Sequence, residues 1–181
     1  MLAGKKYQEE LKQADQDHHT PTAGAMVGHI TANLLIHSLK INQAKWFVKE
    51  TAVLFMEQNA NEWLRKEYVY FDKINELMVS EGEAIPTVTT QLVEYTMLQE
   101  DGAQKYEAGE QQIFDLIKDF DTQLLFITRA IKLAEQEGKT ALRYELGELD
   151  GWIKKQIFKG QRFLGHELTE GLTSAEIDED D

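Results

Sequence analysis

The sequence predicts an all-α fold built on four long helices, and three observations support this. Apolar residues recur at alternating steps of four and three, the spacing that keeps them on one face of an α-helix. The 181 residues contain only two prolines, Pro21 and Pro86, so few positions would break a helix. No stretch shows the period-two alternation of apolar and polar residues that is typical of a strand.

Four stretches carry this helical pattern. The first helix is expected to begin near Thr20 as its capping residue, with Pro21 in the first turn. The third and fourth are expected to end at Gly138 and Gly165, because glycine is favoured just beyond a helix C-terminus. The apolar stripes are Ile30, Leu34, His37, Ile41, Ala44 and Val48; Ala60, Leu64, Glu67, Phe71, Ile74 and Met78; Ile113, Ile117, Phe120, Leu124, Ile127, Ile131 and Ala134; and Leu142, Leu146, Leu149 and Ile153, followed by Ile157, Phe163 and Leu164.

A long connection separates the second stripe from the third. It covers residues 83–103, and a short helix is expected within residues 87–98. A bundle whose helices simply alternate in direction needs only short loops, whereas one long crossover is typical of a ferritin-like four-helix bundle. We therefore predict that fold for residues 20–165, with a helical N-terminal extension at residues 1–19 and a disordered acidic tail at residues 166–181.

Composition narrows the classes of function. The chain has no cysteine, which excludes disulfides, thiolate zinc sites and cysteine catalysis. No apolar run reaches the ~18 residues of a membrane span, and the polar N-terminus does not resemble a signal peptide, so a cytoplasmic location is expected. The net charge of −13 argues against DNA binding by the chain as a whole, because phosphate contacts need clustered cations. The N-terminal candidates for such contacts are Lys5, Lys6 and Lys12.

One candidate metal site lies in "VYFDKINELM", residues 69–78. Asp72 and Glu76 stand four residues apart, so a helix would project both carboxylates from one face. That arrangement suits a metal ion and equally suits a solvated helix surface.

A second candidate lies on the core stripes themselves. In an antiparallel hairpin that turns near residues 51–54, His37 and Glu67 fall at the same level. Burying either group alone is costly, so the two are expected to form a hydrogen-bonded pair or to bind a metal inside the bundle. A metal site would need further ligands from the third and fourth helices, and Asp115 or Asp121 could contribute them.

Four short motifs, in their order and spacing, resemble a known family. They are "KWFVKE" at 45–50, "FDKINELM" at 71–78, "SEGEAIPT" at 80–87 and "FKGQRFLG" at 158–165. From about residue 27 to residue 165 the chain resembles the Dps-type mini-ferritins, the DNA-binding proteins from starved cells. The resemblance implies a four-helix bundle with a short crossover helix and a hollow dodecameric shell. It also implies oxidation of ferrous iron by peroxide, with the mineral stored inside.

The resemblance further implies a ferroxidase site shared by two subunits. Two histidines come from the first long helix and its following turn, and an Asp and a Glu come from the second helix of the neighbour. Asp72 and Glu76 match the two acids, but Lys45 and Glu57 occupy the histidine positions. A protonated lysine cannot bind Fe²⁺. Either Lys45 pairs with these acids across the interface, or Glu57, Asp72 and Glu76 bind a hard cation weakly through oxygen atoms.

The sequence thus predicts a Dps-like homododecamer of the bacterial cytoplasm, associated with the nucleoid. It would bind DNA through its N-terminal extension, bind iron and protect against oxidative damage. Ferroxidase activity is left open, because both histidines are replaced. Two alternatives stand beside this interpretation: a DNA-compacting shell without oxidoreductase activity, and iron oxidation at a relocated site around His37 and Glu67.

Overall fold

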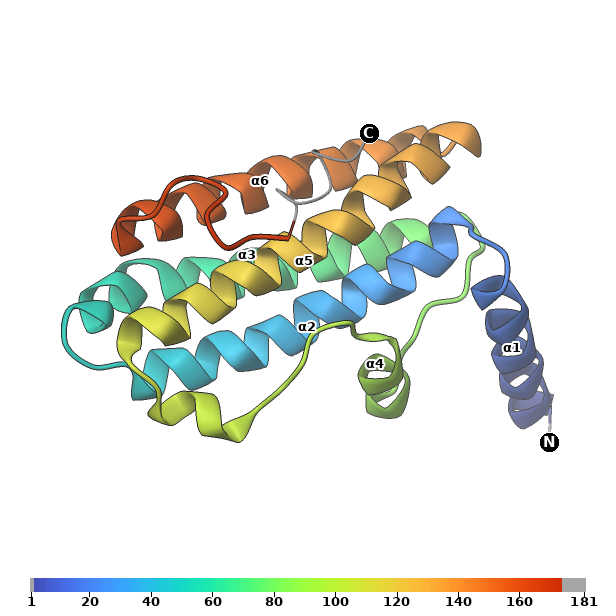
Figure 1. Ribbon diagram of the computed structural model, residues 1–181. Coiled ribbons are helices and arrows are strands. Elements are labelled where there is room, and N and C mark those ends of the chain that lie inside the picture. Colours follow the sequence, from blue (N-terminus) through green and yellow to red (C-terminus); the bar gives the residue numbers. More distant parts are fainter. Residues whose placement is uncertain (1, 174–181) are drawn as a thin grey trace.

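The computed structural model describes residues 2–173, apart from the side chain of His18, and within that range it contains helices and no strand (Figure 1). No helix in this range is long and apolar enough to cross a membrane. The elements are α1 (Leu2–His18), α2 (Ala23–Phe47), α3 (Thr51–Ser80), α4 (Thr89–Tyr95), the 3-10 helix η1 (Gly102–Tyr106), α5 (Gly109–Gln136) and α6 (Thr140–Leu164).

Helices α2, α3, α5 and α6 form the predicted ferritin-like four-helix bundle. Helices α2 and α3 are antiparallel and joined by a tight turn, and α5 and α6 form a second antiparallel pair (Figure 1). The crossover between them, with α4 and η1, runs along α2 to the far end of the bundle. Helix α5 therefore starts beside the α2–α3 turn and runs parallel to α3.

The predicted helix boundaries are close to the observed ones, with two corrections. The cap of α2 is Thr22 rather than Thr20, because the Thr22 hydroxyl accepts a hydrogen bond from the Ala25 amide at 3.1 Å. The α2–α3 turn occupies residues 48–50, slightly before the predicted 51–54. Gly138 and Gly165 adopt positive φ angles of 72° at the ends of α5 and α6, as glycine permits.

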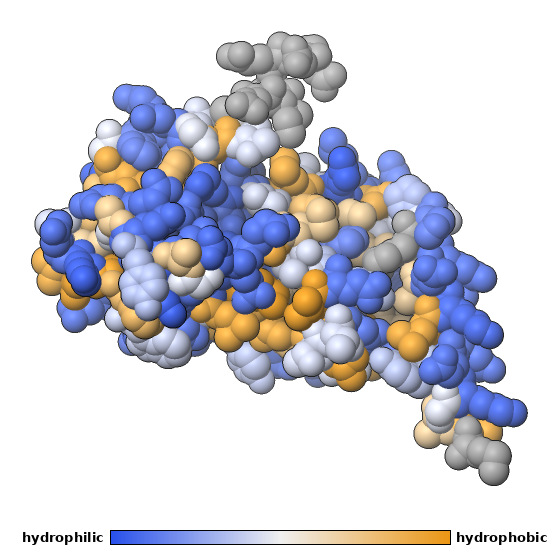
Figure 2. Space-filling view, turned by 60° about the horizontal axis from the view of Figure 1, so that its bottom comes forward, coloured by the Kyte–Doolittle hydropathy of each residue, from blue (hydrophilic) through white to orange (hydrophobic). Residues whose placement is uncertain are grey.

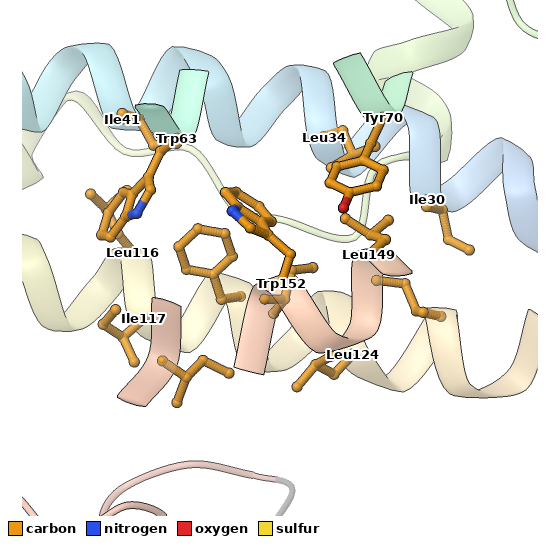
Figure 3. Close-up of a cluster of buried hydrophobic side chains, with 14 of the residues drawn as sticks. Ile30, Leu34, Ile41, Trp63, Tyr70, Leu116, Ile117, Leu124, Leu149 and Trp152 are labelled. Atoms are coloured by element: carbon orange, nitrogen blue, oxygen red, sulfur yellow. The ribbon is translucent and has the colours of Figure 1, made fainter. Parts of the chain in front are cut away.

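The apolar stripes form the core of the bundle. Ile30, Ile41, Ile74 and Ile113 are among the side chains that are almost completely buried. Figure 3 shows Trp63 and Trp152 lying between aliphatic side chains in the interior. The Trp63 indole nitrogen donates to Gln156 Oε1 at 2.9 Å, which satisfies the polar atom of a buried ring.

The segment after α6 is packed rather than disordered as far as it is described. It turns back between α5 and α6 (Figure 1), and Leu172 is 5% exposed against the core. The Gln161 side-chain amide donates to the carbonyl oxygens of Leu168 and Glu170. The predicted disordered tail at 166–181 therefore begins too early, because buried contacts hold residues 166–173. Residues 174–181 lie outside the described part.

We predict opposite effects of two alanine substitutions in α6. A Cβ at Gly160 would overlap the buried side chain of Ile117 on α5. Gly160→Ala should therefore cost about 1–3 kcal/mol of stability, as overpacking of a core does. Gly147 has nothing within 4 Å of its Cβ position. Gly147→Ala should instead add up to about 1 kcal/mol through helix propensity.

Urea unfolding of both variants and the wild type at one protein concentration measures these effects. Equal unfolding midpoints for the two variants would contradict the close α5–α6 contact at Gly160.

Candidate functional site

His37 and Glu67 meet in the centre of the bundle, as their positions on the two stripes predicted. Both side chains are 0% exposed, and His37 Nδ1 lies 2.5 Å from Glu67 Oε1. The Ser38 hydroxyl donates to the other carboxylate oxygen at 3.0 Å. His37 Nε2 lies 3.2 Å from the carbonyl oxygen of Leu116, so the imidazole connects α2 with both α3 and α5.

These contacts determine the protons of the pair. A carbonyl oxygen only accepts hydrogen bonds, so Nε2 must carry a hydrogen. A second proton is shared between His37 Nδ1 and Glu67 Oε1. If Nδ1 holds it, an imidazolium faces a carboxylate, and if Oε1 holds it, both groups are uncharged, so the pair is neutral in either case. Burial acts to lower the pKa of His37, but the charge and hydrogen bond of Glu67 outweigh it and raise that pKa above 6.5. Burial raises the pKa of Glu67 above 4.5. Both shifts mean that the folded pair retains its proton.

This arrangement supports the hydrogen-bonded pair over a metal site inside the bundle. A metal ion needs a free lone pair on an imidazole nitrogen, and both nitrogens of His37 already face protein oxygen atoms. The suggested ligand Asp115 is engaged with Lys118 at 2.7 Å. Asp121 is buried at 2% exposure. Within residues 2–173, no three His, Asp or Glu side chains are grouped as metal ligands.

A neighbouring buried ion pair was not predicted from the sequence. Lys40 Nζ lies 2.6 Å from Asp119 Oδ2 and also donates to the Gln99 carbonyl oxygen at 2.6 Å. It thereby ties the crossover to α2 and α5. The available signal was Lys40, which stands one turn after His37 and next to Ile41 of the apolar stripe.

The residues of the expected interfacial site are all exposed and lie in two separate groups. Asp72 and Glu76 lie one turn apart on α3. Glu57 is on the same helix, but a rise of about 1.5 Å per residue places it roughly 22 Å from Asp72 along the axis. Lys45 donates to Asn61 Oδ1 at 2.6 Å, one turn beyond Glu57. One chain therefore brings Lys45 close to Glu57, and Asp72 close to Glu76, but does not join the two groups.

The N-terminal helix α1 projects from one end of the bundle (Figure 1). It borders a cleft of about 450 Å³ between itself and the bundle, lined by α1 acids Glu9, Glu10 and Asp17 and by Glu83. Lys5, Lys6 and Lys12 are exposed and do not line that cleft. Three of the four acids of α1 are thus directed toward the bundle, while its lysines face solvent.

We predict that stability falls as the pH rises above about 6.5, the ordinary pKa of histidine. The raised pKa of His37 means that above this pH the folded pair still holds its shared proton, whereas an unfolded histidine has lost it. The stabilisation by the pair is therefore complete below this pH and is lost as the pH rises through the folded pKa. Its slope should reach about 1.4 kcal/mol per pH unit. Urea unfolding at a series of pH values gives this slope.

The double variant His37→Leu, Glu67→Leu serves as the control, and it should lack this part of the slope. The two single variants complete a double-mutant cycle, in which contacting residues typically show coupling of about 0.5–3 kcal/mol. Additive effects, or an unchanged slope in the double variant, would show that the pair does not hold the proton.

Neither a protein-family model nor a curated protein sequence matches the chain. Several solved structures do match the chain. DpsB of Lactococcus lactis is 36% identical with a TM-score of 0.87, covering 93% of this chain and 98% of its own. DpsA of the same organism is 33% identical with a TM-score of 0.86, covering 92% and 98%. Dps of Listeria monocytogenes, at 19% identity and a TM-score of 0.79 over 83% of this chain and 98% of its own, shares the fold. The chain therefore belongs to the Dps family of mini-ferritins.

Proposed function

We propose that the chain assembles into a Dps-like dodecameric shell that binds DNA and iron and protects against oxidative damage, with a weak or absent interfacial ferroxidase site. The observation that carries the shell is that α2 exposes large apolar side chains in addition to those that it buries in the core. Leu39 and Trp46 on α2 are 56% and 69% exposed in the single chain. Val93 and Met97 in the crossover are also exposed.

Apolar side chains gather in a band on the face of the molecule that carries the crossover (Figure 2). Contiguous apolar surface of this kind marks a site of protein association. Copies of the same chain are the expected partners, because the family forms closed shells.

A weak ferroxidase site follows from the donor set. Lys45 and Glu57 of one chain can meet Asp72 and Glu76 only if a second subunit contributes one of the two groups. The family's ferroxidase site is shared between subunits in the same way. The joined set would contain three carboxylates and the ammonium group of Lys45, without an imidazole. Oxygen ligands suit hard cations, and the lysine charge opposes a metal ion at short range. Iron is therefore proposed as a cargo that such a site binds loosely.

The second candidate, iron oxidation inside the bundle, has less support. The suggestion rested on His37 and Glu67, whose polar atoms are already engaged by Leu116, Ser38 and each other. A shell without oxidoreductase activity agrees better with these contacts.

DNA binding is proposed for α1. Its lysines are exposed, and most of its acids line the cleft toward the bundle. A single copy is nearly neutral and would bind weakly. Twelve tethered copies would gain avidity of roughly 10²–10⁴ over one copy.

We predict that restoring the two histidines creates ferroxidase activity. Lys45→His with Glu57→His should accelerate peroxide-dependent Fe²⁺ oxidation relative to the wild type, because two imidazoles replace a cation and a carboxylate. The rate of Fe²⁺ loss after peroxide addition, followed by absorbance, measures this. The matched control is Lys49→His with Gln58→His, at exposed neighbouring positions.

Fast oxidation by the wild type that Asp72→Ala abolishes would contradict the weak interfacial site. Oxidation that His37→Leu abolishes and Asp72→Ala does not would favour the site inside the bundle.

We predict that α1 carries most of the DNA affinity. Deleting residues 1–16 should weaken duplex binding in a gel-shift assay, most strongly at low salt. Replacing Lys5, Lys6 and Lys12 by Gln should lower the salt dependence of log K by about 0.9 for each lysine–phosphate ion pair that the substitutions remove. The control variant replaces three exposed cations elsewhere on the chain by Gln, namely Arg65, Arg129 and Lys132. Gel filtration verifies that the shell remains assembled. Undiminished binding by an intact truncated shell would rule out α1 as the DNA-binding element.

A further inference from the structure

A small cavity lies where the crossover meets the bundle, between the C-terminal half of α2 and the first turns of α5. Its volume is about 10 Å³, and the residues that line it include Lys40, Ala44, Gln104, Gln112 and Asp115. Lys40, Gln112 and Asp115 are only 8%, 4% and 8% exposed. An ammonium group, an amide and a carboxylate, all nearly buried, therefore border one small space. We call this space the crossover cavity.

The Gln112 side chain has one hydrogen-bond acceptor that no group of the protein uses. Its amide nitrogen donates to the carbonyl oxygens of Lys105 and Glu107, at 3.3 and 2.9 Å. A flipped amide would place Oε1 against these two carbonyl oxygens, so the orientation of the amide is fixed. Oε1 is buried and has no hydrogen-bond partner among residues 2–173. Because an unpaired buried polar atom costs free energy, such atoms are nearly always paired with protein or with ordered water.

Lys40 has one donor to spare at the same cavity. Its ammonium group carries three hydrogens. Asp119 Oδ2 and the Gln99 carbonyl oxygen each lie 2.6 Å from Nζ and take two of them. Within residues 2–173 no third acceptor is bonded to Nζ. The cavity is therefore bordered by an unused N–H group of Lys40 and by the unused oxygen of Gln112.

These two groups determine the kind of ligand that fits. It must accept a hydrogen bond from Lys40 and donate one to Gln112. A metal cation cannot accept and a halide anion cannot donate, whereas water does both. A volume of about 10 Å³ corresponds to about one water molecule. The Asp115 carboxylate at the same cavity adds a third partner, which gives the number of hydrogen bonds that is typical of a buried water.

We propose that the crossover cavity binds one water molecule, which accepts a hydrogen bond from Lys40 and donates to Gln112 and Asp115, and that this water couples the crossover to the bundle. Lys40 of α2 holds the crossover before η1, through the Gln99 carbonyl oxygen. Gln112 of α5 holds it at the end of η1, through two further carbonyl oxygens. The water joins the two attachments in one network, so release of either end also costs hydrogen bonds at the other. This inference does not depend on the proposed binding of DNA or iron.

A high-resolution crystal structure of the intact full-length protein tests the site directly. One peak of electron density should lie within about 3.2 Å of both Lys40 Nζ and Gln112 Oε1, the range of ordinary hydrogen bonds. The peak should carry no anomalous signal. The absence of a peak, or a peak with the anomalous signal of a metal or chloride ion, would overturn the proposed water site.

Substitution of Ala44, which lines the cavity, tests the coupling by hydrogen exchange. Ala44→Val fills the space of the water, so the amides of Gln104 and Glu107, which form the hydrogen bonds of η1, should exchange several-fold faster than in the wild type. Ala44→Ser places a hydroxyl there and should keep exchange slow, because a hydroxyl both donates and accepts.

Peptides from α6 provide the internal reference for this measurement, and Ala141→Val at an exposed position is the control for the substitution itself. Unchanged exchange in Ala44→Val would overturn the coupling. Equal acceleration by Ala44→Ser, or acceleration that extends equally to α6, would overturn it as well.

Discussion

Burial of an imidazole and a carboxylate at one level is the constraint on which the interior of this bundle depends. Neither His37 nor Glu67 can be buried alone at acceptable cost, so each requires the other and one shared proton. The second nitrogen of His37 then requires a carbonyl oxygen, which Leu116 on α5 provides. Ser38 satisfies the remaining oxygen of Glu67. These requirements hold α2, α3 and α5 in one register.

The same contacts limit what the interior can do chemically. A polar layer inside a ferritin-like bundle could bind metal, but here its donor atoms are directed at one another. Lys40 and Asp119 extend the layer toward the crossover with a further charge-balanced pair. The interior therefore serves to fix the packing. The exposed carboxylates of the proposed interfacial site lie in two separate groups within one chain.

Charge is distributed unevenly over this acidic chain. The lysines of α1 are exposed while most of its acids line the cleft toward the bundle, and residues 154–162 of α6 carry four cations and no acid. The electrostatic potential at the surface therefore depends on local geometry and on salt more than on net charge.

The sequence by itself determined the helices, the crossover and the facing of His37 and Glu67. These follow from the period of the apolar residues, which is local and leaves two ionisable groups at one level of a hairpin. The Lys40–Asp119 pair and the Lys45–Asn61 contact were decided only by the tertiary structure. So was the packing of residues 166–173 between α5 and α6. Each depends on which distant side chains come within a few ångströms, and periodicity along the chain carries no information about those distances.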